Sequence, residues 1–324
     1  MPDTEKQLVI PWAVRLADDR RPAKLALRLS DGYQTSIYCH RPAEAAPLPK
    51  QQPNASNGPR PAGLPPAPGA RKLPVLFVHG IQSHPGWFVG SAGHLAELGY
   101  PVFQVTRRGS GDNAAHRGHA RSARQLLDDV QTACRFVLDR TGAARLHLLG
   151  ISWGGKLLTA FACRQDRQPP IASLTLAAPG IAAQVDVAPA TKIAIALALL
   201  VAPWRRFPIP LSDVELFTDN EEMRRYLRDD PCRLMTATAR FLYASRRLDR
   251  MLQAAPDACL AMPVSLVLAC DDRIIDNART RQALQRLGGA NLLVRELPGA
   301  HTMDFHDDPR PYYHALAEAL ARTK

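Results

Sequence analysis

Short apolar runs alternate with longer amphipathic segments along much of this chain. Residues 73–78, 146–149 and 263–269 are nearly continuous apolar runs, which is typical of parallel strands buried on both faces. Residues 122–138 instead repeat their apolar positions with the period of a helix. Further strands are predicted at residues 101–106, 172–177 and 291–297, and a final helix at 311–321. This alternation predicts an α/β fold with a doubly wound, mostly parallel sheet.

The N-terminal region has a different pattern. Residues 24–29 and 34–38 alternate in polarity around Ser30-Asp31-Gly32, which predicts a hairpin. We therefore expect residues 1–42 to add two antiparallel strands to an edge of the sheet. Residues 43–72 are rich in Pro, Ala and Gly, with almost no apolar periodicity. They are predicted to form a flexible insertion before the core.

The alternation of strands and helices is interrupted once. Residues 73–180 form the first part of the predicted core, and residues 257–324 form its second part. Between them, residues 181–256 are poor in strand patterns and mostly helical in character. We interpret this segment as a helical cap, or lid, inserted into the core.

The composition excludes several classes of protein. A chain of 324 residues can form one large α/β domain with an insertion. No signal-peptide pattern is seen at the N-terminus, and the longest apolar run, residues 193–204, is too short for a bilayer, which needs ~20 residues. The cysteines occur singly, at positions 39, 134, 163, 232, 259 and 270. This spacing favours free thiols in a reducing compartment, and hence a cytoplasmic protein.

The formal net charge of +11 raises the question of nucleic-acid binding. Of the 41 basic residues, 34 are arginine, in a chain also rich in alanine and proline, which is typical of a compositional bias. No nucleic-acid-binding motif or dense basic tract is present, so we expect no nucleic-acid partner. A basic surface would still favour anionic substrates or membrane surfaces.

One motif carries most of the chemical information. Gly150-Ile151-Ser152-Trp153-Gly154 is a G-x-S-x-G sequence between a predicted strand and a predicted helix, which is the context of a nucleophile elbow. The serine of such an elbow lies on a strained turn, and the glycines are needed where a Cβ would collide with the crossing strand or helix. The alternative is a chance match, which this context disfavours. Ser152 is the candidate nucleophile.

The acid and the base of a catalytic triad are expected after the last two strands. The strand at residues 263–269 leads to Asp271 and Asp272, and the strand at 291–297 leads to His301. Only an imidazole can accept the serine proton and return it to a leaving group near pH 7. His306 lies in the same loop but precedes an Asp-Asp-Pro sequence that is typical of a helix start. We therefore prefer His301.

An oxyanion hole is predicted from two backbone amides. The N–H of Trp153 follows the nucleophile at a helix N-terminus. The second donor is expected in the loop after the strand at residues 73–78, most simply the N–H of Ile81. Such donors typically stabilise the transition state by ~2.7–4 kcal/mol each.

These segments together resemble the α/β-hydrolase family. The resemblance covers most of residues 73–323 and is strongest to the capped branch with monoacylglycerol lipases, lysophospholipase-like esterases and S33 serine peptidases. Members of this branch insert their lid where residues 181–256 lie. The Gly-x-x-Asp pattern of the family aligns with Ala269-Cys270-Asp271-Asp272, which favours Asp272 over Asp271 as the acid. The Asp-x-x-Gly-x-Gly turn of the family also aligns, but Thr106 stands in place of its aspartate.

The resemblance implies a serine hydrolase that cleaves carboxylic esters, with a small-molecule acyl ester as substrate and no cofactor or metal. An S33-type aminopeptidase is the first alternative, and it would need a lid carboxylate for the substrate's amino group. Glu215, Glu221 and Glu222 are the candidates. A non-catalytic ligand-binding protein of the same fold is the second alternative. Dehalogenases and epoxide hydrolases are disfavoured because they carry aspartate at the position of Ser152.

Substrate choice is expected to depend on the lid. Residues 193–201 are apolar on all faces, so they do not form an ordinary surface helix. Such a helix is either buried against the core, or it lines an acyl-binding cleft or contacts a lipid surface. If it binds substrate, Ile193, Leu197 and Trp204 are the candidate contacts.

Overall fold

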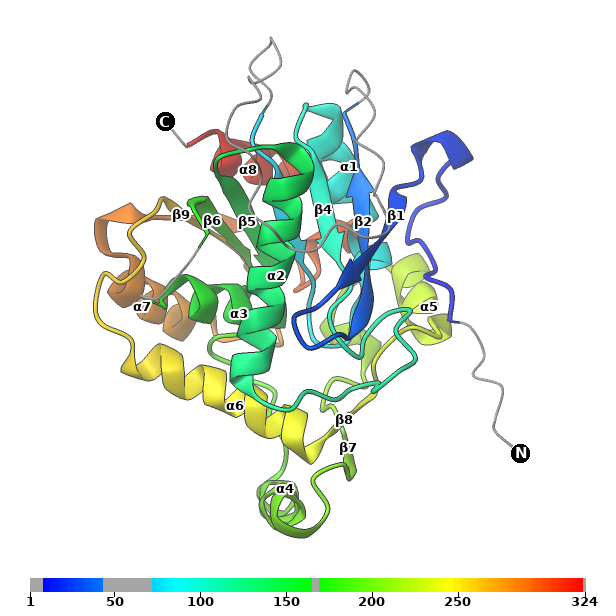
Figure 1. The fold of residues 1–324 in the computed structure, drawn as a ribbon, viewed down its shortest axis with the longest axis vertical. Coiled ribbons are helices and arrows are strands. Elements are labelled where there is room, and N and C mark those ends of the chain that lie inside the picture. The colour runs from blue at the N-terminus through cyan, green and yellow to red at the C-terminus, as the bar shows by residue number, and fades with distance from the viewer. Residues whose placement is uncertain (1–7, 43–71, 165–168, 323–324) are drawn as a thin grey trace.

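The computed structural model describes residues 8–42, 72–164 and 169–322, and eight strands of this part form one sheet (Figure 1). Their order is β1-β2-β4-β3-β5-β6-β9-β10. β2 is antiparallel to both β1 and β4, and the remaining neighbours are parallel. The predicted mostly parallel sheet with an N-terminal hairpin is confirmed. The strands are β1 Ala23–Arg28, β2 Gln34–His40, β3 Val75–Val78, β4 Val102–Val105, β5 Leu146–Ile151, β6 Ile171–Ala177, β9 Val264–Ala269 and β10 Leu292–Leu297.

Helices cover both faces of the sheet. α2 and α3 pack against each other on the face that is in front in Figure 1, and α1 and α8 pack together behind it. α7 contacts β9 and β10. The bounds are α1 Val89–Glu97, α2 Ala123–Thr141, α3 Trp153–Ala162, α7 Asn277–Gly288 and α8 Arg310–Ala321. Local chemistry sets the ends of α2, because Ser122 accepts a hydrogen bond from the Gln125 N–H and Gly142 adopts the left-handed conformation at the C-terminus.

Burial follows the position of each strand in the sheet. Every residue of the central strands β3 and β5 is buried, whereas edge strand β1 alternates between exposed residues and residues that are partly or fully buried. This difference explains why the central strands appear in the sequence as continuous apolar runs and the hairpin as an alternating pattern. The carboxyl ends of the parallel strands meet at one edge of the sheet, which is the edge next to the inserted segment.

Three helices dominate the inserted segment: α4 Pro189–Val201, α5 Glu221–Asp229 and α6 Ala239–Ala254. α6 packs on α2 and α3 of the core, and α4 projects beyond α6 (Figure 1). A small antiparallel pair, β7 Arg206–Pro208 with β8 Thr236–Thr238, was not predicted. Strands of three residues are too short to show a period of two in the sequence.

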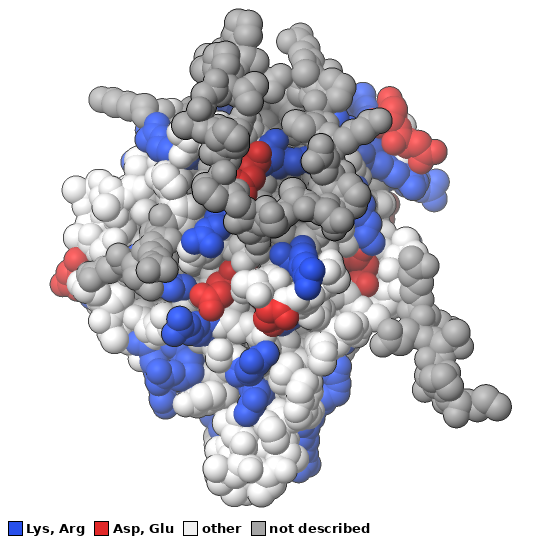
Figure 2. All heavy atoms as spheres, viewed as in Figure 1, with Lys and Arg blue, Asp and Glu red and all other residues white. Residues whose placement is uncertain are grey.

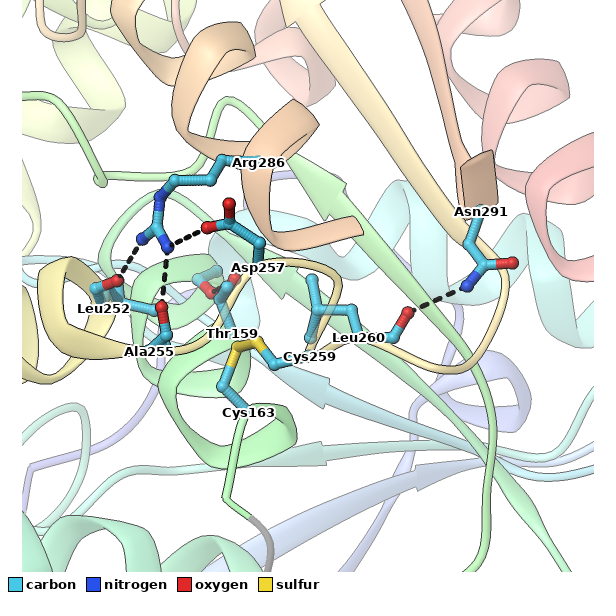
Figure 3. Close-up of a disulfide and its surroundings, with 10 residues drawn as sticks. Thr159, Cys163, Leu252, Ala255, Asp257, Cys259, Leu260, Arg286 and Asn291 are labelled. Carbon is cyan, nitrogen blue, oxygen red and sulfur yellow. Dashed lines mark hydrogen bonds and ion pairs between the residues drawn. A yellow bond between two sulfur atoms is a disulfide. The ribbon is translucent and has the colours of Figure 1, made fainter. Parts of the chain in front are cut away.

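The structure corrects one prediction about cysteines. Cys163, at the C-terminal end of α3, forms a disulfide with Cys259, in the segment between α6 and β9 (Figure 3). Their Cα atoms lie 5.3 Å apart although 96 positions separate them in sequence. The expectation of free thiols is therefore wrong for this pair, because local spacing carries no information about cysteines that only the fold brings together. Cys39, Cys134, Cys232 and Cys270 are free thiols.

The structure bears differently on the predicted insertion and on the predicted absence of a membrane span. The flexible insertion predicted at residues 43–72 lies, apart from Lys72, outside the described residues. Within the described ranges, no helix has the length and apolar character needed to cross a membrane. The cytoplasmic location rested partly on free thiols and stays a prediction.

Candidate active site

Ser152 occupies a strained turn between β5 and α3. Its backbone angles are φ 52° and ψ −123°, a conformation that residues with a Cβ rarely adopt. The flanking glycines make the turn possible. A Cβ on Gly150 would lie 2.7 Å from the Gly155 Cα, and one on Gly154 would collide with the backbone of Val78. These contacts account for the glycines of the G-x-S-x-G motif and present the Ser152 side chain at the N-terminus of α3.

Three side chains from distant segments form one chain of hydrogen bonds. Ser152 Oγ lies 2.9 Å from His301 Nε2, and His301 Nδ1 lies 2.7 Å from Asp272 Oδ2. A carboxylate only accepts hydrogen bonds, so His301 donates from Nδ1 and its Nε2 is free to accept the Ser152 proton. The other oxygen of Asp272, Oδ1, accepts from the N–H groups of Ile274 and Ile275. This is the geometry that general-base activation of a serine requires.

Electrostatics keep the Asp272 carboxyl ionised. Burial by itself would raise the pKa of Asp272. The charge of His301, the hydrogen bond from His301 and the hydrogen bonds from the two backbone N–H groups outweigh this effect and lower the pKa below its usual value. A carboxylate in this position holds the imidazole in one tautomer and stabilises the imidazolium.

The two competing residues have other partners. Asp271 accepts a hydrogen bond from the Gly299 N–H and is exposed. His306 Nε2 donates to the carbonyl of Ala300, at 2.9 Å. The structure thus brings Asp272 and His301, and neither Asp271 nor His306, to Ser152.

The two expected oxyanion donors belong to segments that lie next to Ser152. A Cβ added to Gly80 would lie 3.2 Å from Ser152 Cβ, so the loop after β3 touches Ser152 directly. Trp153 is the first residue of α3, where backbone N–H groups have no partner within the helix. Within the described residues, neither the Ile81 N–H nor the Trp153 N–H donates a hydrogen bond. Both are therefore available to an oxygen bound at Ser152.

The lid candidates lie away from this cluster. Ile193 and Leu197 are 64% and 60% exposed on α4, a helix whose one buried residue is Ala198. Trp204 is 53% exposed and stacks on His119, with ring centroids 3.6 Å apart. The interpretation of residues 193–201 as a buried core helix is wrong. The structure does not bring these three residues together with Ser152, and their role in binding an acyl group stays a prediction.

The inserted segment is tied to α3, the helix that follows Ser152, through residues that have no signal in the sequence. The Trp153 indole N–H donates to Ser245 Oγ on α6 at 2.8 Å. Lys156 Nζ, on α3, lies 3.1 Å from Ser245 Oγ and 2.9 Å from Asp249 Oδ1, also on α6. The sequence has no recognisable pattern for this pair, because Lys156 and Asp249 lie 93 positions apart, on two different helices.

A second polar link ties the loop after β3 to the lid. His84 Nε2 and the Trp87 indole N–H both lie within 2.9 Å of Asp230 Oδ2, and all three side chains are buried. His84 Nδ1 accepts from the Gly86 N–H, so Nε2 carries the proton and donates to Asp230. The sequence gives no signal for this link either, since Asp230 follows α5 and is far from the loop in sequence.

Three features together define the α/β-hydrolase fold. They are the order of strands in the sheet, the strained serine between β5 and α3, and the acid and histidine after β9 and β10. Residues 69–306 match the family described as serine aminopeptidase, S33 (Hydrolase_4). The chain belongs to this family.

Individual relatives are distant. Phospholipase YtpA of Bacillus subtilis is 23% identical over 246 residues, which are 76% of this chain and 93% of that protein. Monoacylglycerol lipase of Mycolicibacterium smegmatis is 24% identical over 238 residues, 72% of this chain and 82% of that protein. Among solved structures, a soluble variant of monoglyceride lipase from Saccharomyces cerevisiae, bound to a substrate analog, has a TM-score of 0.75 at 18% identity. That match covers 97% of this chain and 99% of the yeast chain, and it supports the fold alone.

Proposed function

We propose that this protein is a serine hydrolase that cleaves carboxylic esters. The observation that carries the proposal is the continuous chain of hydrogen bonds from Asp272 through His301 to Ser152 on a strained turn. The distant relatives that are named monoacylglycerol lipase and phospholipase support an ester as the bond that is cleaved.

The first half of the proposed reaction forms an acyl-enzyme. Ser152 Oγ attacks the ester carbonyl carbon while its proton passes to His301 Nε2. The N–H groups of Ile81 and Trp153 stabilise the negative charge that develops on the carbonyl oxygen. The imidazolium of His301, stabilised by Asp272, then gives its proton to the departing alcohol oxygen. The acyl group remains bonded to Ser152.

The second half repeats these steps with water. His301 takes a proton from the water as its oxygen attacks the acyl-enzyme, and the same two N–H groups stabilise the second tetrahedral intermediate. His301 then returns the proton to Ser152 Oγ as the bond to the acyl carbon breaks. A carboxylic acid leaves and the starting enzyme is restored.

The aminopeptidase alternative has less support. The lid carboxylates proposed for it, Glu215, Glu221 and Glu222, are exposed. Glu221 is paired with Arg228, Arg224 and Arg225. An exposed, paired carboxylate offers a substrate's ammonium group little binding energy, because water and arginine already solvate it.

The lid also supports a finer proposal about where the substrate is found. α4 exposes Ile193, Leu197, Leu200 and Val201, and Trp204 follows them. In Figure 2 the projecting end of the molecule is mostly white, and Lys and Arg side chains lie beside it. Several large apolar side chains exposed on one helix are typical of an interaction site, and basic residues beside them favour an anionic surface. We propose that α4 contacts lipid surfaces that contain the ester.

A panel of p-nitrophenyl esters from acetate to palmitate, assayed beside aminoacyl anilides, tests the function. Ester hydrolysis should dominate. Ser152→Ala should lower kcat by several orders of magnitude and abolish labelling by a fluorophosphonate probe. Ser173→Ala is the matched control, because Ser173 Oγ also lies close to a histidine, 2.7 Å from His147 Nδ1, but on the buried part of β6. Faster cleavage of anilides than of esters, or labelling that persists in Ser152→Ala, would contradict the proposal.

A further inference from the structure

Arg107 is a buried cation beside the candidate oxyanion hole. It lies in the turn after β4, next to Thr106, where the related family usually has aspartate. Its side chain is 5% exposed. Among the described residues, no carboxylate forms an ion pair with it. A buried cation without an anionic partner is costly to fold, which suggests that this charge has a use.

The hydrogen bonds of Arg107 converge on one loop. Nη2 donates to the carbonyl of Gly80 at 2.6 Å and to that of Ile81 at 2.9 Å. The Gly80 carbonyl belongs to the same peptide group as the Ile81 N–H. All described peptide bonds are trans, so the C=O and N–H of this group point in opposite directions. With Arg107 on the carbonyl side, the N–H of Ile81 faces away from the guanidinium.

A second donor reaches the same carbonyl. His79 Nε2 accepts from the Arg107 backbone N–H at 3.2 Å, so the proton of this imidazole is on Nδ1. Nδ1 therefore donates to the Gly80 carbonyl at 3.0 Å. Burial, followed by the charge of Arg107, lowers the pKa of His79 well below its usual value, so the ring is neutral at pH 7. The Gly80 oxygen thus accepts two hydrogen bonds, one of them from a cation.

Arg107 also contacts the second expected donor residue. Its guanidinium lies over the Trp153 ring, 4.6 Å from the centroid. Burial lowers the pKa of Arg107 to about 9, which still leaves it charged at pH 7. One cation therefore contacts both residues whose N–H groups are expected to bind the oxyanion. The cation–π contact with Trp153, together with the hydrogen bond to Ile81, helps to fix the positions of these two residues relative to each other.

We propose that Arg107 is a positioning residue that orients and polarises the Ile81 N–H of the oxyanion hole. Hydrogen bonds in series strengthen one another, and a charged donor on the carbonyl makes the N–H of the same peptide group a stronger donor. The gain appears mainly in the transition state, when the substrate oxygen becomes negative, so it raises kcat more than it lowers KM. This inference rests on the proposed ester hydrolysis by Ser152.

Neutral and charged substitutions of Arg107 test the proposal on a soluble p-nitrophenyl ester. Arg107→Met and Arg107→Gln should lower kcat about tenfold with KM within about twofold, since polarisation is a fraction of a donor's full contribution. A trifluoromethyl ketone, which forms an oxyanion with the serine, should bind more weakly by a similar factor. Arg107→Lys should recover most of both losses, because it restores the charge. Circular dichroism and the melting temperature establish that each variant is folded.

Arg117→Met is the matched control. Arg117 is a partly buried arginine that, like Arg107, donates to backbone carbonyls, here those of Gly111, Cys232 and Arg233. Within the described part of the chain, no hydrogen bond joins it to the loop of Gly80. Its loss should lower stability and leave kcat and ketone affinity near the values of the unmodified protein. A folded neutral Arg107 variant with unchanged kcat and ketone affinity overturns the inference, as does a lysine variant no better than the neutral ones. If Ser152→Ala kept its activity, the proposed function itself would fail.

Discussion

At the scale of single residues, orientation rather than identity decides which histidine can act on Ser152. His301 and His306 lie in the same loop after β10, and both are partly or fully shielded from solvent. His301 Nε2 lies 2.9 Å from the serine oxygen, whereas His306 uses its Nε2 to bind the Ala300 carbonyl. A histidine whose acceptor nitrogen faces the nucleophile can serve as a base.

This difference predicts the outcome of a matched pair of substitutions. His301→Gln should lose nearly all ester hydrolysis, by about three orders of magnitude, because no group then accepts the Ser152 proton. His306→Gln should keep most of the activity, since an amide can also donate to the Ala300 carbonyl. Steady-state kinetics on p-nitrophenyl butyrate measure both. The reverse order of the two effects would show that the assignment of the base is wrong.

A second residue-scale feature predicts a dependence of stability on pH. Asp304 lies in the His301 loop and accepts hydrogen bonds from the N–H and Oγ of Ser91. Burial raises the pKa of Asp304 to about 7, despite the opposing effect of Ser91. In the unfolded chain this carboxyl ionises near pH 4, whereas in the folded protein it keeps its proton up to about pH 7. Unfolding therefore releases a proton between these two values, and the free energy of unfolding falls as the pH rises through this window.

Asp304→Asn should remove this dependence. At pH 4 both proteins carry a neutral side chain at position 304, which makes that pH the internal control. From pH 4 to 7 the melting temperature of the variant should rise relative to the unmodified protein by several degrees, and the difference should level off above pH 7. Thermal melts in a series of buffers measure it. A constant difference from pH 4 to 8 would show that Asp304 is already ionised in the folded protein.

At the scale of elements, α3 connects Ser152 to the inserted segment. Its first turn follows Ser152, and Lys156 pairs with Asp249 of α6. Its last residues lead to Cys163, whose disulfide holds the chain that returns from the lid (Figure 3). Arg286 of α7 donates to the carbonyls of Leu252 and Ala255 in the same region. These contacts together hold the C-terminal end of the lid against the core.

Loss of the disulfide should therefore destabilise the folded protein. A crosslink over 96 positions restricts the unfolded chain strongly, an effect worth about 4–5 kcal/mol in the chain-entropy model. Cys163→Ser with Cys259→Ser should lower the melting temperature by about 5 °C or more, as should incubation of the unmodified protein with a dithiol. Cys270→Ser is the control, since this exposed thiol has no partner cysteine. Equal melting temperatures for all variants would mean that the crosslink adds no stability.

At the scale of the whole molecule, the apolar surface is unevenly distributed. The core buries its large side chains around the sheet, yet α4 exposes four large aliphatic residues at one extremity of the molecule (Figures 1 and 2). Exposure of the apolar surface of α4 to water costs roughly 25 cal/mol of free energy per Å². Contact with a lipid surface would remove that cost and hold the enzyme close to its substrate.

Leu197→Asp tests this and the acyl-pocket hypothesis together. Because Leu197 is exposed, the variant should fold normally, and its kcat/KM for p-nitrophenyl acetate should not change. Binding to vesicles with anionic lipid should weaken about tenfold or more, because a buried leucine contributes roughly 1.5–3 kcal/mol. If α4 instead lines the acyl site, KM for soluble octanoate should rise far more than KM for acetate. Leu293→Asp, at another exposed leucine, is the control, and unchanged behaviour in both assays would refute both roles.

The fold and the candidate catalytic residues could be predicted from the sequence for local physical reasons. A strand buried on both faces must be apolar throughout, and a strained serine needs glycines at fixed spacing, so residues 146–149 and Gly150–Gly154 carry their own signal. Ser152, Asp272 and His301 follow β5, β9 and β10, which is the chain order of serine, acid and histidine in this fold. Ser152, Asp272 and His301 could be named as candidates for this reason.

Only the tertiary structure decided which distant residues meet. The Cys163–Cys259 disulfide, the Lys156–Asp249 pair and the His84–Asp230 link each join segments that have no periodic relation in sequence. The exposure of α4 was equally hidden, because an apolar helix has the same composition whether it packs in a core or projects from the surface. The contacts of Arg107 with Gly80, Ile81 and Trp153 likewise join separate segments, and packing over the whole molecule brings these segments together.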